Sequence, residues 1–311
     1  MWPAVHDVLA LADHTSSTLR SGPTFRGALA ASYRAEHQGR EVTLLLTRDV
    51  AQLDLGARRM AVGSGLRPES APYCNIISTV AKGKLPHGEA QATYREAAAP
   101  QAPLRYFLFE RMQGTSLAPL VLEARKAKPW ALADACALIR ELAALLPHAE
   151  RGHFDPCTAG VDAKGLWTLH PTLDEFLRAV RREGREPVKW LGYQAPESLR
   201  AGVRGEAGAV FGLGVLLHEL LAGKPLFDQA SALLTLKSLA HDTPAPLAWL
   251  VPGTPLPVAA CAQAMLDRDP LRRPQLAAVT RELSSFASTS EEWKARAVAA
   301  TSEDAPFLAR L

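Results

Sequence analysis

The feature that most constrains this chain is a stretch at residues 206–222 that is apolar on every side. Its sequence is EAGAVFGLGVLLHELLA, without proline and with few polar residues. A helix that is apolar all round is buried on all sides, so the sequence predicts a central helix enclosed by other elements. Gly223 follows directly, and glycine at this position is typical of a helix end.

The chain before residue 116 carries strand signals instead. Residues 24–35 and 41–47 have the alternation of strands and flank the turn Gln38-Gly39-Arg40, which predicts a hairpin. Two further strand-like runs lie at 73–80 and 104–110. The stretches 56–72 and 82–103 are rich in glycine, proline and polar residues, and we expect loops there.

After residue 116 the apolar spacing becomes helical. Residues 132–146 form one apolar face that ends at Pro147, and 258–266 and 275–286 are two further amphipathic segments. Strands followed by helices predict an α+β fold with two lobes.

Composition excludes several classes of function. Of the 311 residues 48% are hydrophobic and 22% charged, and the net charge of +3 is too small to indicate nucleic-acid binding. The longest apolar run, Val210–Leu221, is too short to span a membrane. The sequence contains no CxxC pair, so neither zinc binding nor redox chemistry is indicated. The four cysteines are widely spaced, which suits the reducing cytoplasm, and we place the protein there. They are Cys74, Cys136, Cys157 and Cys261.

Three passages carry a resemblance to a known family. Residues 192–197 (GYQAPE) resemble the GY-x-APE end of a kinase activation segment, and 210–227 resemble the buried F helix followed by G-x-P-x-F. Residues 266–274 resemble the L-x-x-DP-x-x-RP stretch that follows. In this order and spacing they are similar to bacterial Ser/Thr protein kinases of the Hanks type, over residues 15–286.

The resemblance implies a two-lobe protein-kinase-like fold. A small β-rich N-lobe would occupy residues 15–115 and a larger α-helical C-lobe residues 116–290, followed by a tail at 291–311. It also implies an ion pair between Glu197 and Arg273, which ties the activation segment to the last helices and which we expect to be buried and structural.

The parts that a kinase uses to bind nucleotide are mostly replaced. Of the three glycine positions in the phosphate loop only Gly27 is a glycine, and Leu45 stands where the phosphate-binding Lys belongs. The hinge, from Glu110 to Met112, keeps backbone groups that can bind an adenine ring. We therefore expect no ATP or Mg²⁺ cofactor.

The catalytic loop and the metal ligands are also altered. Asp155 in His153-Phe154-Asp155 fits the position of the catalytic base, but Gly160 and Pro171 replace the Asn and Asp that bind Mg²⁺. Alternatively, Asp155-Pro156 simply begins a tight turn, and as a loop residue Asp155 is expected to be exposed. No metal site is predicted.

The first hypothesis is a pseudokinase, a regulatory or scaffold protein in signalling that docks a protein partner, for example an active kinase or its substrate. The alternative is an atypical active Ser/Thr protein kinase that transfers phosphate from ATP to protein. It would use Asp155 as base and displaced metal ligands among Asp162, Asp174 and Glu175. A third is a kinase fold with another chemistry, such as nucleotidyl transfer.

Overall fold

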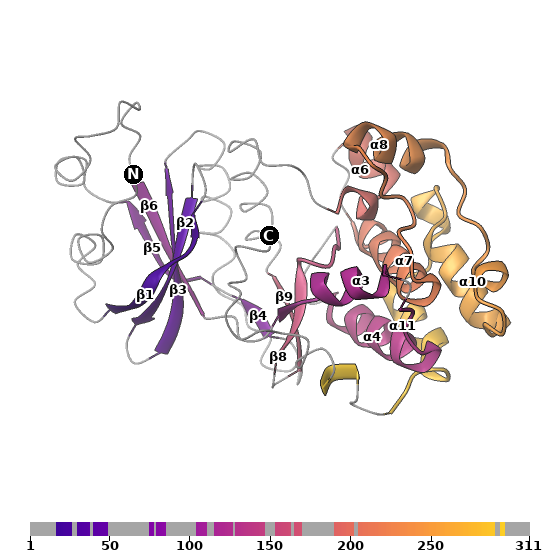
Figure 1. The fold of residues 1–311 in the computed structure, drawn as a ribbon, viewed down its shortest axis with the longest axis horizontal. Coiled ribbons are helices and arrows are strands. Elements are labelled where there is room, and N and C mark those ends of the chain that lie inside the picture. Colours follow the sequence, from indigo (N-terminus) through magenta and orange to yellow (C-terminus); the bar gives the residue numbers. More distant parts are fainter. Residues whose placement is uncertain are drawn as a thin grey trace.

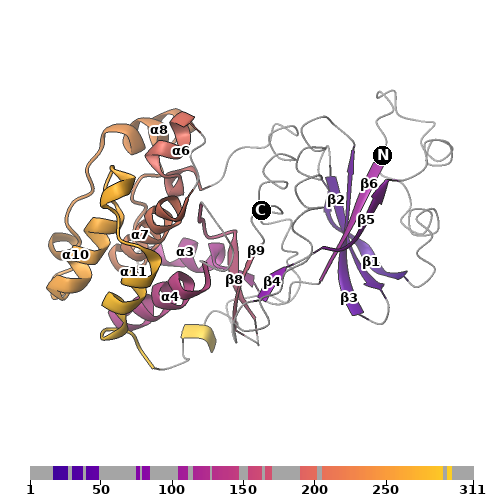
Figure 2. The same cartoon turned by 180° about the vertical axis from the view of Figure 1, so that it is seen from behind.

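The described part of the chain is an α+β structure in which strands come first and helices follow. The computed structural model describes residues 17–26, 30–37, 40–48, 75–77, 79–84, 104–110, 115–126, 128–146, 153–162, 165–169, 190–201, 205–289 and 293–295. Figure 1 shows a large sheet at one end and a body of helices at the other, and Figure 2 shows them from behind. The predicted α+β class is confirmed for these residues.

The large sheet is antiparallel and five-stranded. Its order is β1 (Ser17–Arg26), β2 (Ala30–His37), β3 (Arg40–Arg48), β6 (Leu104–Glu110) and β5 (Thr79–Lys84). The predicted hairpin is confirmed, because His37 at the end of β2 pairs with Arg40 at the start of β3. The strand predicted over 104–110 is β6, with the same bounds.

Two other strand predictions are wrong in their boundaries. Residues 24–35 are divided between β1 and β2, because Arg26 pairs with Ala31 and the chain reverses between them. Residues 73–80 are divided between β4 (Asn75–Ile77) and β5, which belong to different sheets, and β5 runs on to Lys84. In both places a strand-like composition continues through the break, and composition does not specify which strand each residue pairs with.

A second, smaller sheet contains strands from both halves of the chain. Its order is β4, β9 (Gly165–Leu169), β8 (Ala159–Asp162) and β7 (Thr115–Ser116). Strand β4 pairs in parallel with β9, and the other pairs are antiparallel. The sheet therefore links the strand-rich first part of the chain to the helical second part.

The predicted helices are all present in the helical body, with ends shifted by no more than two residues. They correspond to α4, α7, α10 and α11. The helices within the described ranges are α3 (Ala118–Ala124), α4 (Leu132–Leu145), α6 (Pro196–Ala201), α7 (Glu206–Ala222), α8 (Ala232–His241), α9 (Leu247–Leu250), α10 (Leu256–Met265) and α11 (Leu276–Ser284), with 3-10 turns η3 (Leu191–Tyr193) and η4 (Pro270–Arg272).

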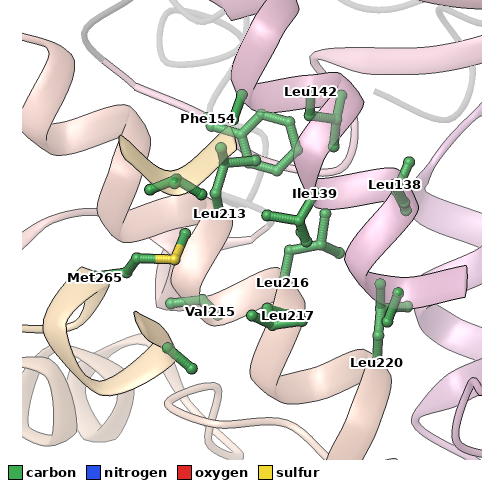
Figure 3. Close-up of a cluster of buried hydrophobic side chains, with 14 of the residues drawn as sticks. Leu138, Ile139, Leu142, Phe154, Leu213, Val215, Leu216, Leu217, Leu220 and Met265 are labelled. Atoms are coloured by element: carbon green, nitrogen blue, oxygen red, sulfur yellow. The ribbon is translucent and has the colours of Figure 1, made fainter. Parts of the chain in front are cut away.

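Helix α7 is the centre of the hydrophobic core. Every residue from Gly208 to Leu221 is buried, and Gly223 ends the helix at a φ of 68°. Helices α3, α4, α9 and α10 pack against it. Figure 3 shows side chains of α4, such as Ile139, beside those of α7, such as Leu216. Each fully buried leucine stabilises the fold by about 1.5–3 kcal/mol.

The last described residues pack on this helical body. Trp293, which the division made from the sequence places in the tail, is 1% exposed, and its ring centre lies 6.5 Å from that of Trp130. Lys294 Nζ lies 3.2 Å from Glu141 Oε2 on α4. Within the ranges that the structure describes, no helix is long and apolar enough to cross a membrane.

Candidate functional site

The loop of residues 153–158 carries Asp155 and is closed by its own hydrogen bonds. The Cys157 backbone N–H donates to Asp155 Oδ1 at 2.8 Å, and the Thr158 backbone N–H donates to the Asp155 carbonyl at 3.0 Å. Thr158 Oγ1 donates to the same carbonyl at 2.7 Å. The chain thus makes a tight turn here, the second of the two interpretations that the sequence allows for Asp155-Pro156.

The expectation that Asp155 is exposed is wrong. The residue is 4% exposed, and its Oδ2 lies 3.0 Å from His153 Nε2. The reason is Phe154, which is 0% exposed and lies among core side chains such as Leu142 of α4 and Leu213 of α7 (Figure 3). Because this ring anchors the loop in the core, the residues on either side of it are drawn inward.

Helix α7 approaches the loop so closely that it needs a glycine at the contact. A Cβ added to Gly212 would lie 2.5 Å from the Phe154 carbonyl oxygen, well inside van der Waals contact. One turn earlier, Ala209 is 0% exposed. An alanine side chain offers no hydrogen bond, so close packing joins this part of the loop to α7.

The segment that precedes α6 is held by a buried carboxylate on α7. Glu219 is 1% exposed and accepts from the Tyr193 hydroxyl at 2.8 Å and from the Leu226 backbone N–H at 3.0 Å. Arg125, just after α3, donates to it from Nε at 3.0 Å and from Nη2 at 2.9 Å. Four donors therefore compensate one buried charge.

Asp228 extends this arrangement. Its Oδ2 lies 2.6 Å from Arg125 Nη2, and its Oδ1 accepts from the Gly192 backbone N–H at 2.8 Å. A Cβ added to Gly192 would lie 2.6 Å from that Oδ1, so only glycine fits without movement. We call Arg125, Tyr193, Glu219 and Asp228 the Glu219 cluster.

Trp190 covers the cluster in a left-handed backbone conformation. Its φ is 60°, the only positive φ of a non-glycine residue in the described ranges. The Arg125 guanidinium carbon lies 4.8 Å from its ring centre, and the Tyr193 ring meets it edge-on at 5.7 Å. Such backbone conformations cost on the order of 1–3 kcal/mol and persist where the surroundings impose them.

Burial and charge act in opposite directions on the ionisable groups of the cluster. Burial raises the pKa of Glu219, and the charge and hydrogen bonds of Arg125 oppose that rise. Burial likewise acts to lower the pKa of Arg125, but the carboxylate of Glu219 outweighs it and the pKa is raised. Burial and the negative charge of Glu219 raise the pKa of Tyr193, so this phenol stays a hydrogen-bond donor at neutral pH.

The structure brings Glu197 and Arg273 together. Arg273 Nη1 donates to Glu197 Oε1 at 2.7 Å and Nη2 to Oε2 at 2.8 Å, so the pair has the two parallel bonds that only arginine can offer. The same guanidinium donates to the carbonyls of Ala207 and Asp267 and lies 5.0 Å from the Phe211 ring centre. The Arg273 side chain is 0% exposed and that of Glu197 is 17% exposed.

The predicted nucleotide-site positions are only partly described. Leu45 lies within β3, Glu110 is the last residue of β6, and Gly160 lies in β8 opposite Trp167. The described residues include no group of three or more His, Cys, Asp or Glu that could hold a metal ion. Other predicted positions lie outside the described residues: Gly27, Met112, Pro171, Asp174 and Glu175.

No protein-family model and no curated protein matches the sequence.

The Glu219 cluster is the part of the site that reasoning from the sequence missed. Arg125 and Glu219 are 94 positions apart, and no pattern in the sequence links them. One signal was available, because an acid in a helix that is apolar all round is buried, and a buried acid needs a partner. That argument indicates a cation near Glu219 but does not identify it.

Proposed function

We propose that this chain is a pseudokinase-like protein of the cytoplasm. It has a two-lobe kinase-like fold, with an N-lobe at 15–115 and a C-lobe at 116–290, and it acts in signalling as a regulatory or scaffold protein that binds a protein partner. The observation that carries this proposal is the state of Asp155. Its carboxylate is buried and engaged with the Cys157 N–H and with His153 rather than presented to a substrate.

The chemistry of phosphoryl transfer supports the same proposal. That reaction depends on positioning and on neutralising the charge that develops on the phosphates. Leu45 and Gly160 stand where a kinase has a Lys and a metal-binding Asn, and neither supplies a charge or a side-chain oxygen. By contrast, the contacts of Glu197 with Arg273 hold α6 to the region before α11 and need no nucleotide.

Incubation with labelled ATP, Mg²⁺ or Mn²⁺ and generic protein substrates tests the proposal. We expect no labelling above that of Asp155→Asn, a variant that keeps the shape of the side chain and one of its two acceptor oxygens. In a thermal-shift titration we expect ATP to give little or no stabilisation, and none that depends on Mg²⁺. A ligand at 100 times its Kd stabilises by about 2.7 kcal/mol. Labelling that requires Asp155, or a large Mg²⁺-dependent shift, would establish the atypical kinase instead.

A further inference from the structure

Helix α8 exposes three of its four leucines and buries two of its small polar residues. Leu233, Leu234 and Leu236 are 76%, 49% and 36% exposed, whereas Thr235 and Ser238 are 3% and 4% exposed. A surface helix normally turns its apolar side to the core. In α8, by contrast, three leucines are exposed, and Figure 1 shows this helix at the outer edge of the helical body.

The inward side of α8 is complete without those leucines. Thr235 Oγ1 accepts from the Gln229 backbone N–H at 2.9 Å, and Ser238 Oγ donates to Asp242 Oδ2 at 2.6 Å. Leu239, 1% exposed, anchors the helix in the core. The N-terminus is capped as well, since Ser231 Oγ accepts from the Leu234 N–H at 3.3 Å. The exposed leucines are therefore not needed to hold the helix in place.

Basic side chains share the outward side with the leucines. Lys237 and His241 follow Leu233 at intervals of four residues, which places them on one side of the helix. Both are exposed, and within the described ranges neither forms an ion pair. We call Leu233, Leu234, Leu236, Lys237 and His241 the α8 surface.

We propose that the α8 surface docks an acidic amphipathic helix of a partner protein. Exposed leucines gathered in one place indicate a surface that is covered in a complex. Lys237 is complementary to a carboxylate at the rim of that contact. Another helix fits because leucines spaced along a helix match side chains at i, i+3 and i+4 of a partner helix. This inference rests on the proposed function as an interaction protein and specifies where the partner binds and its chemistry.

A protein fits this surface better than a lipid membrane does. Helices that lie on membranes carry many Lys and Arg residues on their polar side. The α8 surface has one lysine, Lys237, and no arginine. The attraction to anionic lipid is correspondingly small, whereas one lysine can fix the register of a protein contact.

A defined peptide tests the proposal with the full chain. The probe is a fluorescein-labelled helical peptide of about 18 residues, several turns long, with Leu at i, i+3 and i+4 and Glu elsewhere. We expect saturable binding by fluorescence anisotropy. The double variant Leu233→Ser/Leu236→Ser should bind at least about tenfold more weakly, because two apolar contacts are lost, and Lys237→Glu should also bind more weakly. Leu271→Ser is the matched control: Leu271 is 91% exposed but lies on η4, and binding should not change.

Several results would overturn the proposal. One is that the peptide shows no saturable binding. Another is that a peptide with Lys in place of Glu binds equally well. A third is that the α8 variants bind the peptide as well as the wild type does, once circular dichroism has confirmed that the variants are folded. Sedimentation velocity that shows a dimer dissociated by the same variants would assign the surface to a second copy of the chain. Stronger binding to phosphatidylserine vesicles than to the peptide would assign it to a membrane.

The two proposals can fail separately. If the peptide does not bind and ATP labelling is absent, the α8 surface is refuted and the pseudokinase-like function stands. If the peptide binds and Asp155-dependent labelling is found, the protein is an enzyme and the α8 surface stands.

Discussion

One buried carboxylate, Glu219, is part of the central helix α7, and another, Asp155, is in the loop that α7 packs against. The two carboxylates differ in where their hydrogen-bond partners come from. Glu219 bonds to Arg125 and Tyr193, which are 94 and 26 positions away. Asp155 bonds to His153 and Cys157, each two positions away. The first carboxylate ties separate elements together, whereas the second holds one turn in shape.

This difference predicts two kinds of response to mutation. Loss of a contact between distant elements lowers the stability of the whole helical body, because several elements are then no longer held together. Loss of a contact within one loop acts mainly on that loop, and the rest of the core keeps its packing. The Glu197–Arg273 pair belongs with Glu219, since its partners are 76 positions apart.

The largest effect is expected for Arg273→Ala. Removing this guanidinium leaves Glu197 and two backbone carbonyls without their donor, and breaking a buried pair typically costs about 3–5 kcal/mol. Denaturant melts measure the loss. Arg273→Lys is the control that keeps the charge but not the two parallel bonds, and its loss should be intermediate. If Arg273→Ala melts like the wild type, contacts between distant elements do not dominate stability here.

Arg125→Met should come next. It leaves Glu219, 1% exposed, without its cation, and we expect a loss of about 2–3 kcal/mol because Arg125 itself is partly exposed. The matched control is the next residue, Lys126→Met, whose side chain is 65% exposed and whose ion pair in the described part of the chain is with the exposed Glu123. That variant should melt like the wild type. Equal melting of both variants would show that the Glu219 cluster does not hold the elements together.

Asp155→Ala should destabilise less and more locally. The buried Cys157 N–H loses its acceptor, and an unsatisfied buried donor costs about 1–3 kcal/mol. Asp155→Asn keeps an acceptor oxygen and should lose less. Native-state hydrogen exchange distinguishes the two kinds of response: the amides of Cys157 and Thr158 should exchange much faster, while those of α7 should exchange faster only in proportion to the loss of global stability. A loss larger than that of Arg273→Ala would reverse the comparison.

The same distinction explains which parts of the fold could be predicted. Helix α7 and strand β6 follow from the apolar residues within one segment, and both have the predicted bounds. The break between β4 and β5 depends on pairing with strands far along the chain, which the local sequence does not encode. At the site, family resemblance alone led to the expectation of the Glu197–Arg273 pair, and no comparable motif led to Arg125. The burial of Asp155 was missed because the anchoring role of its neighbour Phe154 depends on packing against α7.

The smallest effect we predict concerns His218, a buried ionisable group next to Glu219 on α7 that is less compensated than either Glu219 or Asp155. It is 2% exposed, its Nε2 lies 3.4 Å from the Ala245 carbonyl oxygen, and its Nδ1 has no hydrogen-bond partner among the described residues. Burial lowers its pKa, the hydrogen bond to Ala245 opposes that shift, and the charge of Lys224 adds to it. The folded state therefore binds this proton less readily than the unfolded state does.

A lowered pKa means that neutral His218 contributes stability above the pKa of unfolded histidine, about 6.5. That contribution is lost as the pH falls below this value and through the lower pKa of the folded state. Denaturant melts from neutral pH downward should therefore show a loss that is smaller in His218→Gln, which does not titrate. If both proteins lose stability in parallel over this window, other groups carry the pH dependence. Neutral His218, with one weak hydrogen bond, would then be tolerated on α7 without making the free energy of unfolding depend on pH. The neighbouring Glu219 differs from it because its buried charge is fully compensated.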